Sequence, residues 1–153
     1  MEKKSWILPI LAGLISLISL LFPAAYVEIV FFISVKSYIW MCGYVQTEIG
    51  ANKTARFSSN PLVIYPSLIS TAVVVVSSVL LLLSANQVRS GQSKEKTWLY
   101  SGILLLSAVL FWIVMMVNFN ANFWDVYNVG FGLIGPIIGG ILALLSYILK
   151  DKF

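Results

Sequence analysis

The 153-residue chain contains no histidine and only one cysteine, Cys42. Without histidine, no imidazole is present to act as the base of a nucleophile–base pair or as a metal ligand. A single cysteine forms no intramolecular disulfide and provides no cluster for zinc. We therefore expect no enzyme activity, no bound metal and no cofactor. Cys42 is interpreted as a small buried structural residue, with an intermolecular disulfide as the less favoured alternative.

Charge is also scarce, and long apolar runs take its place. Charged residues make up 10% of the chain and hydrophobic residues 59%, whereas a typical soluble domain is about 25% charged. This balance predicts an integral membrane protein in contact with the lipid bilayer. Four charge-free runs are long enough to cross about 30 Å of hydrocarbon as helices: residues 6–22, 62–83, 98–117 and 131–149. We therefore predict a single domain with four membrane spans and no separate soluble domain.

The first run has some features of a signal peptide, because basic residues precede it and small residues follow it. It is long for the apolar region of a signal, and Pro23 is a poor residue three positions before a cleavage site. We therefore expect residues 6–22 to be retained as a span.

The positions of lysine and arginine predict the orientation. Seven of the ten lie at the N-terminus, in the loop 84–97 or at the C-terminus: Lys3, Lys4, Arg89, Lys94, Lys96, Lys150 and Lys152. Both termini and this loop are therefore expected in the cytoplasm, and loops 23–61 and 118–130 outside a plasma or cell membrane. The basic residues do not form the dense cluster that nucleic acid requires, so no nucleic-acid partner is expected.

No charged side chain falls inside the four runs, which argues against ion pumps and coupled transporters. The outer loops hold three carboxylates, Glu28, Glu48 and Asp125. Solvated or ion-paired side chains are a simpler interpretation for them than an acid–base pair.

The segment 26–50 alternates with a period of two. Its odd-numbered positions from Val27 to Val35 are apolar, whereas the even positions include Glu28, Ser34 and Lys36. This alternation of β-branched and aromatic residues predicts strands with one buried face. A membrane helix is the rejected alternative, because it would place Glu28 and Lys36 in hydrocarbon at a cost of about 2.5–3.5 kcal/mol each.

The polar stretch 47–61 is predicted to be a loop that returns the chain to the membrane. Asn52, Lys53 and Thr54 fit the acceptor sequence for N-glycosylation in this loop, and modification at Asn52 is left open.

Aromatic and small residues mark two further candidate surfaces. Phe123, Trp124 and Tyr127 in the second outer loop are typical of an interfacial girdle, with a contact surface as the alternative. Gly135, Gly139 and Ala143 repeat at four-residue steps on one face of the last span, which permits close helix packing. Packing within the bundle is favoured there over a dimer interface.

Residues 38–46, YIWMCGYVQ, resemble the Gly-Leu-Trp-x-x-Cys signature of the claudin and peripheral-myelin-protein tetraspan superfamily. Tyr38 and Ile39 stand at the Gly-Leu positions, Cys42 lies one residue nearer the tryptophan, and the second family cysteine is absent. The resemblance implies a four-helix transmembrane bundle, of the all-α membrane class, with a small antiparallel sheet in the first extracellular loop. It also implies that Trp40, beside Cys42, packs between sheet and bundle, where a large amphipathic ring is suited to the junction.

These observations favour a non-enzymatic membrane protein that mediates lateral assembly or membrane–membrane contact through its outer loops, with another copy or another membrane protein as partner. Phe123, Trp124 and Tyr127 are the expected contact residues. One alternative is an accessory subunit of a larger membrane complex, docked through the glycine face of the last span. Another is a passive pore between copies, with Glu28, Lys36 or Glu48 setting ion selectivity.

Overall fold

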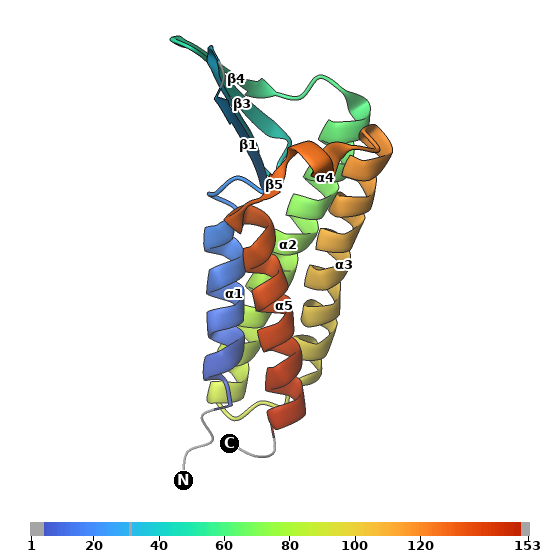
Figure 1. Cartoon of the computed structure of the whole chain (residues 1–153). Helices are drawn as coiled ribbons and strands as arrows, with labels where there is room; N and C mark the ends of the chain where they lie inside the picture. Colours follow the sequence, from blue (N-terminus) through green and yellow to red (C-terminus); the bar gives the residue numbers. More distant parts are fainter. Residues whose placement is uncertain (1–4, 31, 151–153) are drawn as a thin grey trace.

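The computed structural model describes residues 5–30 and 32–150. Phe31 and the terminal residues Lys3, Lys4 and Lys152, on which some of the predictions above rest, lie outside these ranges. Four helices pack side by side and carry a small sheet at one end (Figure 1). These helices are α1 (Ile7–Ser19), α2 (Pro61–Arg89), α3 (Lys96–Phe119) and α5 (Phe131–Leu149), and a short helix, α4 (Phe123–Val126), precedes α5.

Three helices in the described ranges, α2, α3 and α5, are apolar and long enough to cross a membrane by length and composition. They indicate an integral membrane protein. Helix α2 begins where the sequence provides a start signal, because Pro61 occupies its first position and the Asn60 side chain accepts a hydrogen bond from the Leu62 N–H at 2.9 Å. It ends at Arg89, six residues beyond the predicted boundary.

Helix α1 is shorter than the predicted span of residues 6–22. It has 13 residues, about 20 Å at 1.5 Å per residue, and falls short of the roughly 30 Å of hydrocarbon. The N–H groups of Leu20, Leu21 and Phe22 bond to carbonyls three residues earlier, so the chain tightens into turns before Pro23. The prediction of four membrane spans is therefore confirmed only in part: three helices are long enough to span, and the fourth predicted span is a short apolar helix.

The sheet has five antiparallel strands in the order β4-β3-β2-β1-β5. The predicted strand segment forms β1 (Ala25–Val30), β2 (Ser34–Ile39) and β3 (Tyr44–Ile49), and two further strands join them, β4 (Asn52–Phe57) and β5 (Asn128–Val129). Residues 52–57 therefore form a strand where a loop was predicted. The reason is the two-residue turn Gly50-Ala51, in which Gly50 has a φ of 58°. Glycine with positive φ at the first turn position is what a type II′ hairpin needs.

Strand β5 ties loop 118–130 to loop 23–61. It pairs with β1 at Ala25 and Tyr26. The N–H groups of Gly130 and Gly132 then donate to the carbonyls of Ala24 and Pro23, at 2.8 and 3.0 Å. The sheet is thus bonded to the start of α5 as well as following directly from α1.

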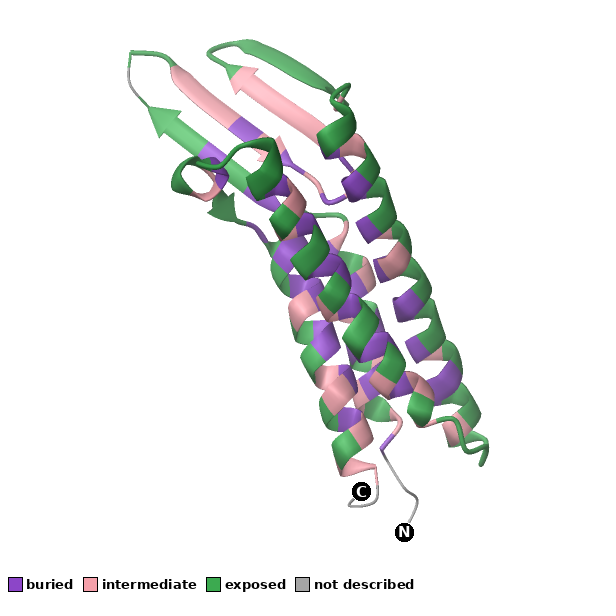
Figure 2. Cartoon of the chain, turned by 90° about the vertical axis from the view of Figure 1, so that its right-hand side faces the viewer, coloured by how far each residue is buried: buried purple, intermediate pink, exposed green. Residues whose placement is uncertain are grey.

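The two faces of the sheet differ. The core face is buried in its part nearest the bundle, where Ser37 accepts a hydrogen bond from the Tyr127 hydroxyl, and its residues include Val27, Ser37, Ile39 and Thr47. The opposite face, called the ladder face below, carries Tyr26, Glu28, Lys36, Tyr38, Gln46, Glu48 and Lys53. In the helices, buried residues line the sides that face one another and exposed apolar residues cover the outside (Figure 2), as expected for a bundle surrounded by lipid.

Candidate interaction surfaces of the outer sheet

The segment 38–46 forms the end of β2, a tight turn and the start of β3, placed on top of the bundle. The Trp40 N–H bonds to the Tyr44 carbonyl at 2.9 Å, and the Gly43 N–H bonds to the Trp40 carbonyl at 2.9 Å. Met41, at the turn, is 1% exposed and belongs to the hydrophobic core. Met41 therefore fixes this turn to the bundle.

Trp40 lies at the junction between the sheet and α1. Its indole Nε1 donates to the Leu21 carbonyl at 3.1 Å, just beyond the end of the helix. Its ring makes an edge contact with Tyr44, with centroids 5.4 Å apart, and the ring itself is half-buried. Cys42, in the turn between β2 and β3, is also half-buried, not fully buried as predicted.

Gly43 allows this turn to approach α2 closely. Its φ of 81° is unfavourable for any residue with a side chain. A Cβ at this position would lie 2.9 Å from Ile64 Cδ1 and 3.2 Å from Ser67 Cβ, both in α2. The turn is therefore seated directly on the first turns of α2.

The aromatic residues of loop 118–130 pack against the bundle. Together with Trp112 of α3 they form what we call the aromatic cluster: Trp112, Phe123, Trp124 and Tyr127. Phe123 is 1% exposed and stacks on Tyr127, with centroids 4.6 Å apart. Trp124 and Tyr127 are half-buried. This placement differs from the predicted contact surface, because the short helix α4 turns the Phe123 side chain into the bundle.

The aromatic cluster links the bundle to the sheet through hydrogen bonds. Trp112 Nε1 donates to Ser67 Oγ of α2 at 3.0 Å, in a buried position. At the other end of the cluster, the Tyr127 hydroxyl donates to Ser37 Oγ of β2 at 3.5 Å. The cluster therefore connects α2, α3, α4 and β2, and it sets the position of the sheet above the helices.

Four charged side chains alternate in sign across the ladder face. Lys36 lies between Glu28 and Glu48 in the register, and Glu48 also lies opposite Lys53. The ion pairs Lys36–Glu28 and Glu48–Lys53 have N–O distances of 2.5 and 3.0 Å. Hydrogen bonding and charge from Glu28 raise the pKa of Lys36, whereas a hydrogen bond from Lys53 lowers the pKa of Glu48. The outer charges proposed for a pore, Glu28, Lys36 and Glu48, are thus neutralised within one row.

The end of the sheet farthest from the bundle is apolar. The turn between β1 and β2 and the adjoining turn between β3 and β4 expose a group of large hydrophobic side chains with no charged residue among them. This apolar tip consists of Ile29, Val30, Phe32, Ile33 and Ile49, with exposed fractions of 47, 69, 101, 60 and 50%. A group of exposed large apolar side chains at one end of a sheet is a candidate interaction surface.

Strand β4 is an open edge, exposed along its whole length (Figure 2). Asn52, the candidate glycosylation site, begins this strand at the sheet's distal turn and is exposed. Lys53 and Arg56 also lie on it. Basic side chains on an edge strand oppose unwanted pairing with another strand.

The small residues of α5 face α1. A Cβ on Gly135 would lie 2.1 Å from Ser19 Cβ, and a Cβ on Gly139 would lie 1.9 Å from Ser16 Oγ. Ala143 is fully buried one step farther along. The glycine face is therefore covered by α1, and no open seam is left there for a partner subunit.

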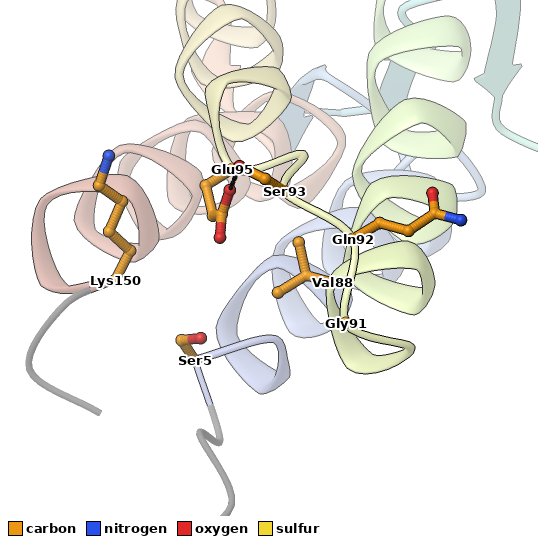
Figure 3. Close-up of a pocket in the computed structure, with 7 residues that line it drawn as sticks. All are labelled: Ser5, Val88, Gly91, Gln92, Ser93, Glu95 and Lys150. Carbon is orange, nitrogen blue, oxygen red and sulfur yellow. Dashed lines mark hydrogen bonds between the residues drawn. The ribbon is translucent and has the colours of Figure 1, made fainter.

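Two hollows lie away from the sheet. At the opposite end of the bundle, a polar pocket of about 240 Å³ is lined by residues from the turn between α2 and α3, by Ser5 and by Lys150 (Figure 3). Ser93 donates to Glu95 within it, at 3.1 Å. The second hollow is an apolar groove of about 200 Å³ between α2 and α3, lined by Ile69, Ser70, Val73, Leu104, Ser107, Ala108 and Phe111. Within the described part of the chain, the buried Ser70 hydroxyl has no hydrogen-bond partner.

Sequence reasoning missed several of these features. The charged row had a visible signal, since charges of alternating sign occur at 28, 36, 48 and 53, but only the strand register shows that they are neighbours. Strand β5 gave no sequence signal, because two residues are too few to show a period.

No family model matches the sequence, and no curated protein matches it. The surfaces must therefore be interpreted from their own chemistry.

Proposed function

We propose that the chain is a non-enzymatic, claudin-like membrane protein with four spans, which brings two membranes into contact through its outer sheet. Helix α1 is the fourth span, with its short length extended by the apolar turns at either end. Both termini lie in the cytoplasm and the sheet lies outside, in agreement with the positive-inside distribution of lysine and arginine.

The apolar tip is the observation that carries this proposal. It lies at the end of the sheet most distant from the bundle (Figure 1), where a side chain would be the first to meet an opposing membrane protein. Removing such side chains from water on contact yields about 25 cal/mol for each Å² buried. The partner is a second copy in the opposing membrane, because a twofold contact needs only one self-complementary surface.

The β4 edge is a weaker candidate for contact between copies. In a full-length antiparallel pair of two β4 strands, Lys53 of one copy would lie opposite Arg56 of the other. Like charges directly opposite each other destabilise a strand pair. The apolar tip carries no such penalty, and it is therefore the surface we assign to contact.

The test uses vesicles that contain the purified protein, half of them labelled with a donor lipid dye and half with an acceptor. We expect vesicles with the unchanged protein to cluster, which raises light scattering and energy transfer without lipid mixing. The double variant Val30→Asp, Ile33→Asp should abolish clustering. The control Thr54→Asp, Ala55→Asp adds the same charges to the exposed β4 edge and should leave clustering intact. Equal clustering by the tip variant would refute the contact role.

A second function is favoured by the apolar groove between α2 and α3. A helix of another membrane protein could lie in this groove against the exposed Ser107, since small residues and hydroxyl groups are typical of helix contacts in lipid. The chain would then be an accessory subunit. Purification from native membranes in mild detergent separates the two functions, because only an accessory subunit recovers a stoichiometric foreign protein, and Ser107→Leu should release it.

A further inference from the structure

A pocket of about 270 Å³ lies between the ladder face and the segment that follows α1. Its lining residues are Pro23, Tyr38, Trp40, Gln46 and Glu48. It is separate from the apolar tip, which lies at the other end of the sheet, and from the core face. Its lining combines aromatic rings with one carboxylate.

The rings are arranged as two walls of an aromatic cage. The centroids of Tyr38 and Trp40 are 6.3 Å apart and their planes are inclined at 52°. Tyr44 supports Trp40 from the side through an edge contact at 5.4 Å. A cation placed against the faces of such rings is attracted by their quadrupoles, and quaternary ammonium groups are bound in this way.

Glu48 is the charged residue of the pocket lining, and one of its carboxylate oxygens is ion-paired with Lys53. Gln46 Nε2 and Lys53 Nζ both contact Glu48 Oε1, each at 3.0 Å, so among these contacts the second carboxylate oxygen is not used. The hydrogen bond from Lys53 lowers the pKa of Glu48, which keeps it ionised at neutral pH. Lys36, the other cation near Glu48, is paired with Glu28. The lining therefore favours a cation over an anion.

The pocket lies beside the membrane surface. Trp40 bonds to the carbonyl of Leu21, and Leu21, Phe22 and Ile18 expose 76, 46 and 52% of their surfaces at the outer end of α1. A ligand held in the pocket would have this apolar surface next to it. A phospholipid with an amine head group satisfies both features, because its cation fits the rings and its acyl chains fit the side of α1.

We propose that this pocket binds the ammonium or trimethylammonium head group of a phospholipid in the outer leaflet. The proposal relies on the outer end of α1 lying at the membrane surface and does not rely on contact between copies. Binding would anchor the sheet to the bilayer on the side where α1 is too short to reach the full hydrocarbon thickness.

The test titrates the protein, held in a sugar-based detergent, with a short-chain phosphatidylcholine and follows binding by calorimetry. Phosphatidylglycerol with the same chains is the head-group control, and choline chloride is the control for a free cation. We expect saturable binding of phosphatidylcholine and at least tenfold weaker binding of phosphatidylglycerol. Weak binding of choline alone identifies the lipid as the ligand, whereas equally tight binding identifies a free amine with the same chemistry. Equal affinity for phosphatidylglycerol would overturn the proposal.

Variants distinguish the loss of ligand binding by the aromatic cage from the loss of folding. Tyr38→Leu should weaken phosphatidylcholine binding by about five- to thirtyfold, the range expected for one desolvated cation–ring contact. Glu48→Gln should also weaken binding, because it removes the carboxylate from the lining. Tyr38→Phe retains the ring and should retain binding. Asp125→Asn makes the same kind of chemical change at an exposed position outside the pocket lining, and should have no effect. Unchanged binding by both Tyr38→Leu and Glu48→Gln, in variants that unfold at the unchanged temperature, would overturn the proposal.

Discussion

At the scale of single residues, the close contact between α1 and α5 depends on pairs of small side chains. Serine on α1 meets glycine on α5 twice, as Ser16 with Gly139 and Ser19 with Gly135. Both hydroxyls bond to carbonyls of their own helix, Ser16 to Ala12 at 2.9 Å and Ser19 to Ser16 at 2.8 Å. These bonds satisfy the polar groups internally, so the interface itself is held by packing, as is usual in lipid.

We predict that Gly135→Ala destabilises the protein by about 1–3 kcal/mol, the usual cost of overpacking. The new Cβ would lie 2.1 Å from Ser19 Cβ, whereas the nearest backbone atom, the Ile15 carbonyl oxygen, is 3.3 Å away. Ser19→Gly should therefore relieve the clash, at a cost of its own of about 1 kcal/mol in a helix. Thermal unfolding in detergent of both single variants and the double variant measures the coupling. Additive effects would show that the two residues do not meet.

The hydrogen bond from Trp112 to Ser67 is the second residue-scale test. It is buried and joins α3 to α2 at 3.0 Å. A double-mutant cycle with Trp112→Phe and Ser67→Ala should give a coupling of about 0.6 kcal/mol and at most about 1.7 kcal/mol, as for other hydrogen bonds between helices in membranes. Val109→Ala, at another buried position on α3, should show no coupling with Ser67→Ala. A coupling of zero for Trp112 would mean that the bond does not form.

At this scale, the sequence identified residues that make close contacts, but it did not specify the neighbours toward which their side chains point. The four-residue spacing of Gly135 and Gly139 predicted a close helix contact, but the sequence did not specify that α1 is the neighbour. The aromatic residues 123, 124 and 127 were recognised as a group. Their inward packing depends on α4, and four residues are too few for a helical period to be detected.

At the scale of elements, the sheet is held by the ladder face on one side and by the aromatic cluster on the other. The alternating charges pair neighbouring strands, because Lys36 joins β2 to β1 and Lys53 joins β4 to β3. Both pairs are partly exposed, so each contributes modestly to stability and weakens with salt. Their larger effect is on register, since a slip of one residue would move every charge to the core face.

We predict that pairing of β4 with β3 weakens in acid. The folded pKa of Glu48 lies below its ordinary value of 4.5, so its ion pair contributes full stability above that value. The contribution is lost as the pH falls below 4.5 through the lower folded pKa. Hydrogen-exchange protection factors for the β4 amides should therefore decrease between pH 6 and pH 3. Lys53→Met should remove most of this pH dependence, and an unchanged decrease in that variant would exclude the ion pair as its cause.

The sequence predicts some of these elements and not others. Strands β1 to β3 follow from the alternation of apolar and polar residues, because one face is buried. Strand β4 is exposed along its length, so its sequence does not need to alternate between apolar and polar residues. Only its pairing with β3 makes it a strand. Helix α1 was overestimated because residues 20–22 are as apolar as the helix, and hydropathy does not distinguish helical residues from the turns that precede Pro23.

At the scale of the whole molecule, the bundle is asymmetric. The short helix α1 continues directly into the sheet and packs against α2 and α5, and these two helices also pack against α3. At the end of α1 farthest from the sheet, Trp6 lies under the guanidinium of Arg89, with the Arg89 carbon 5.1 Å from the ring centroid. This contact fixes the beginning of α1 to the end of α2.

The central claim is that α1, although short, crosses the membrane and carries the sheet to the outer side. Three reporters test it in sealed, right-side-out vesicles: an N-terminal epitope tag, and single cysteines at Thr54→Cys and Gln92→Cys in a Cys42→Ser background. Labelling with an impermeant maleimide and antibody binding, before and after permeabilisation, should show only residue 54 accessible before permeabilisation. An N-terminal tag accessible together with residue 54 in intact vesicles would contradict the claim, because α1 would not then cross the membrane.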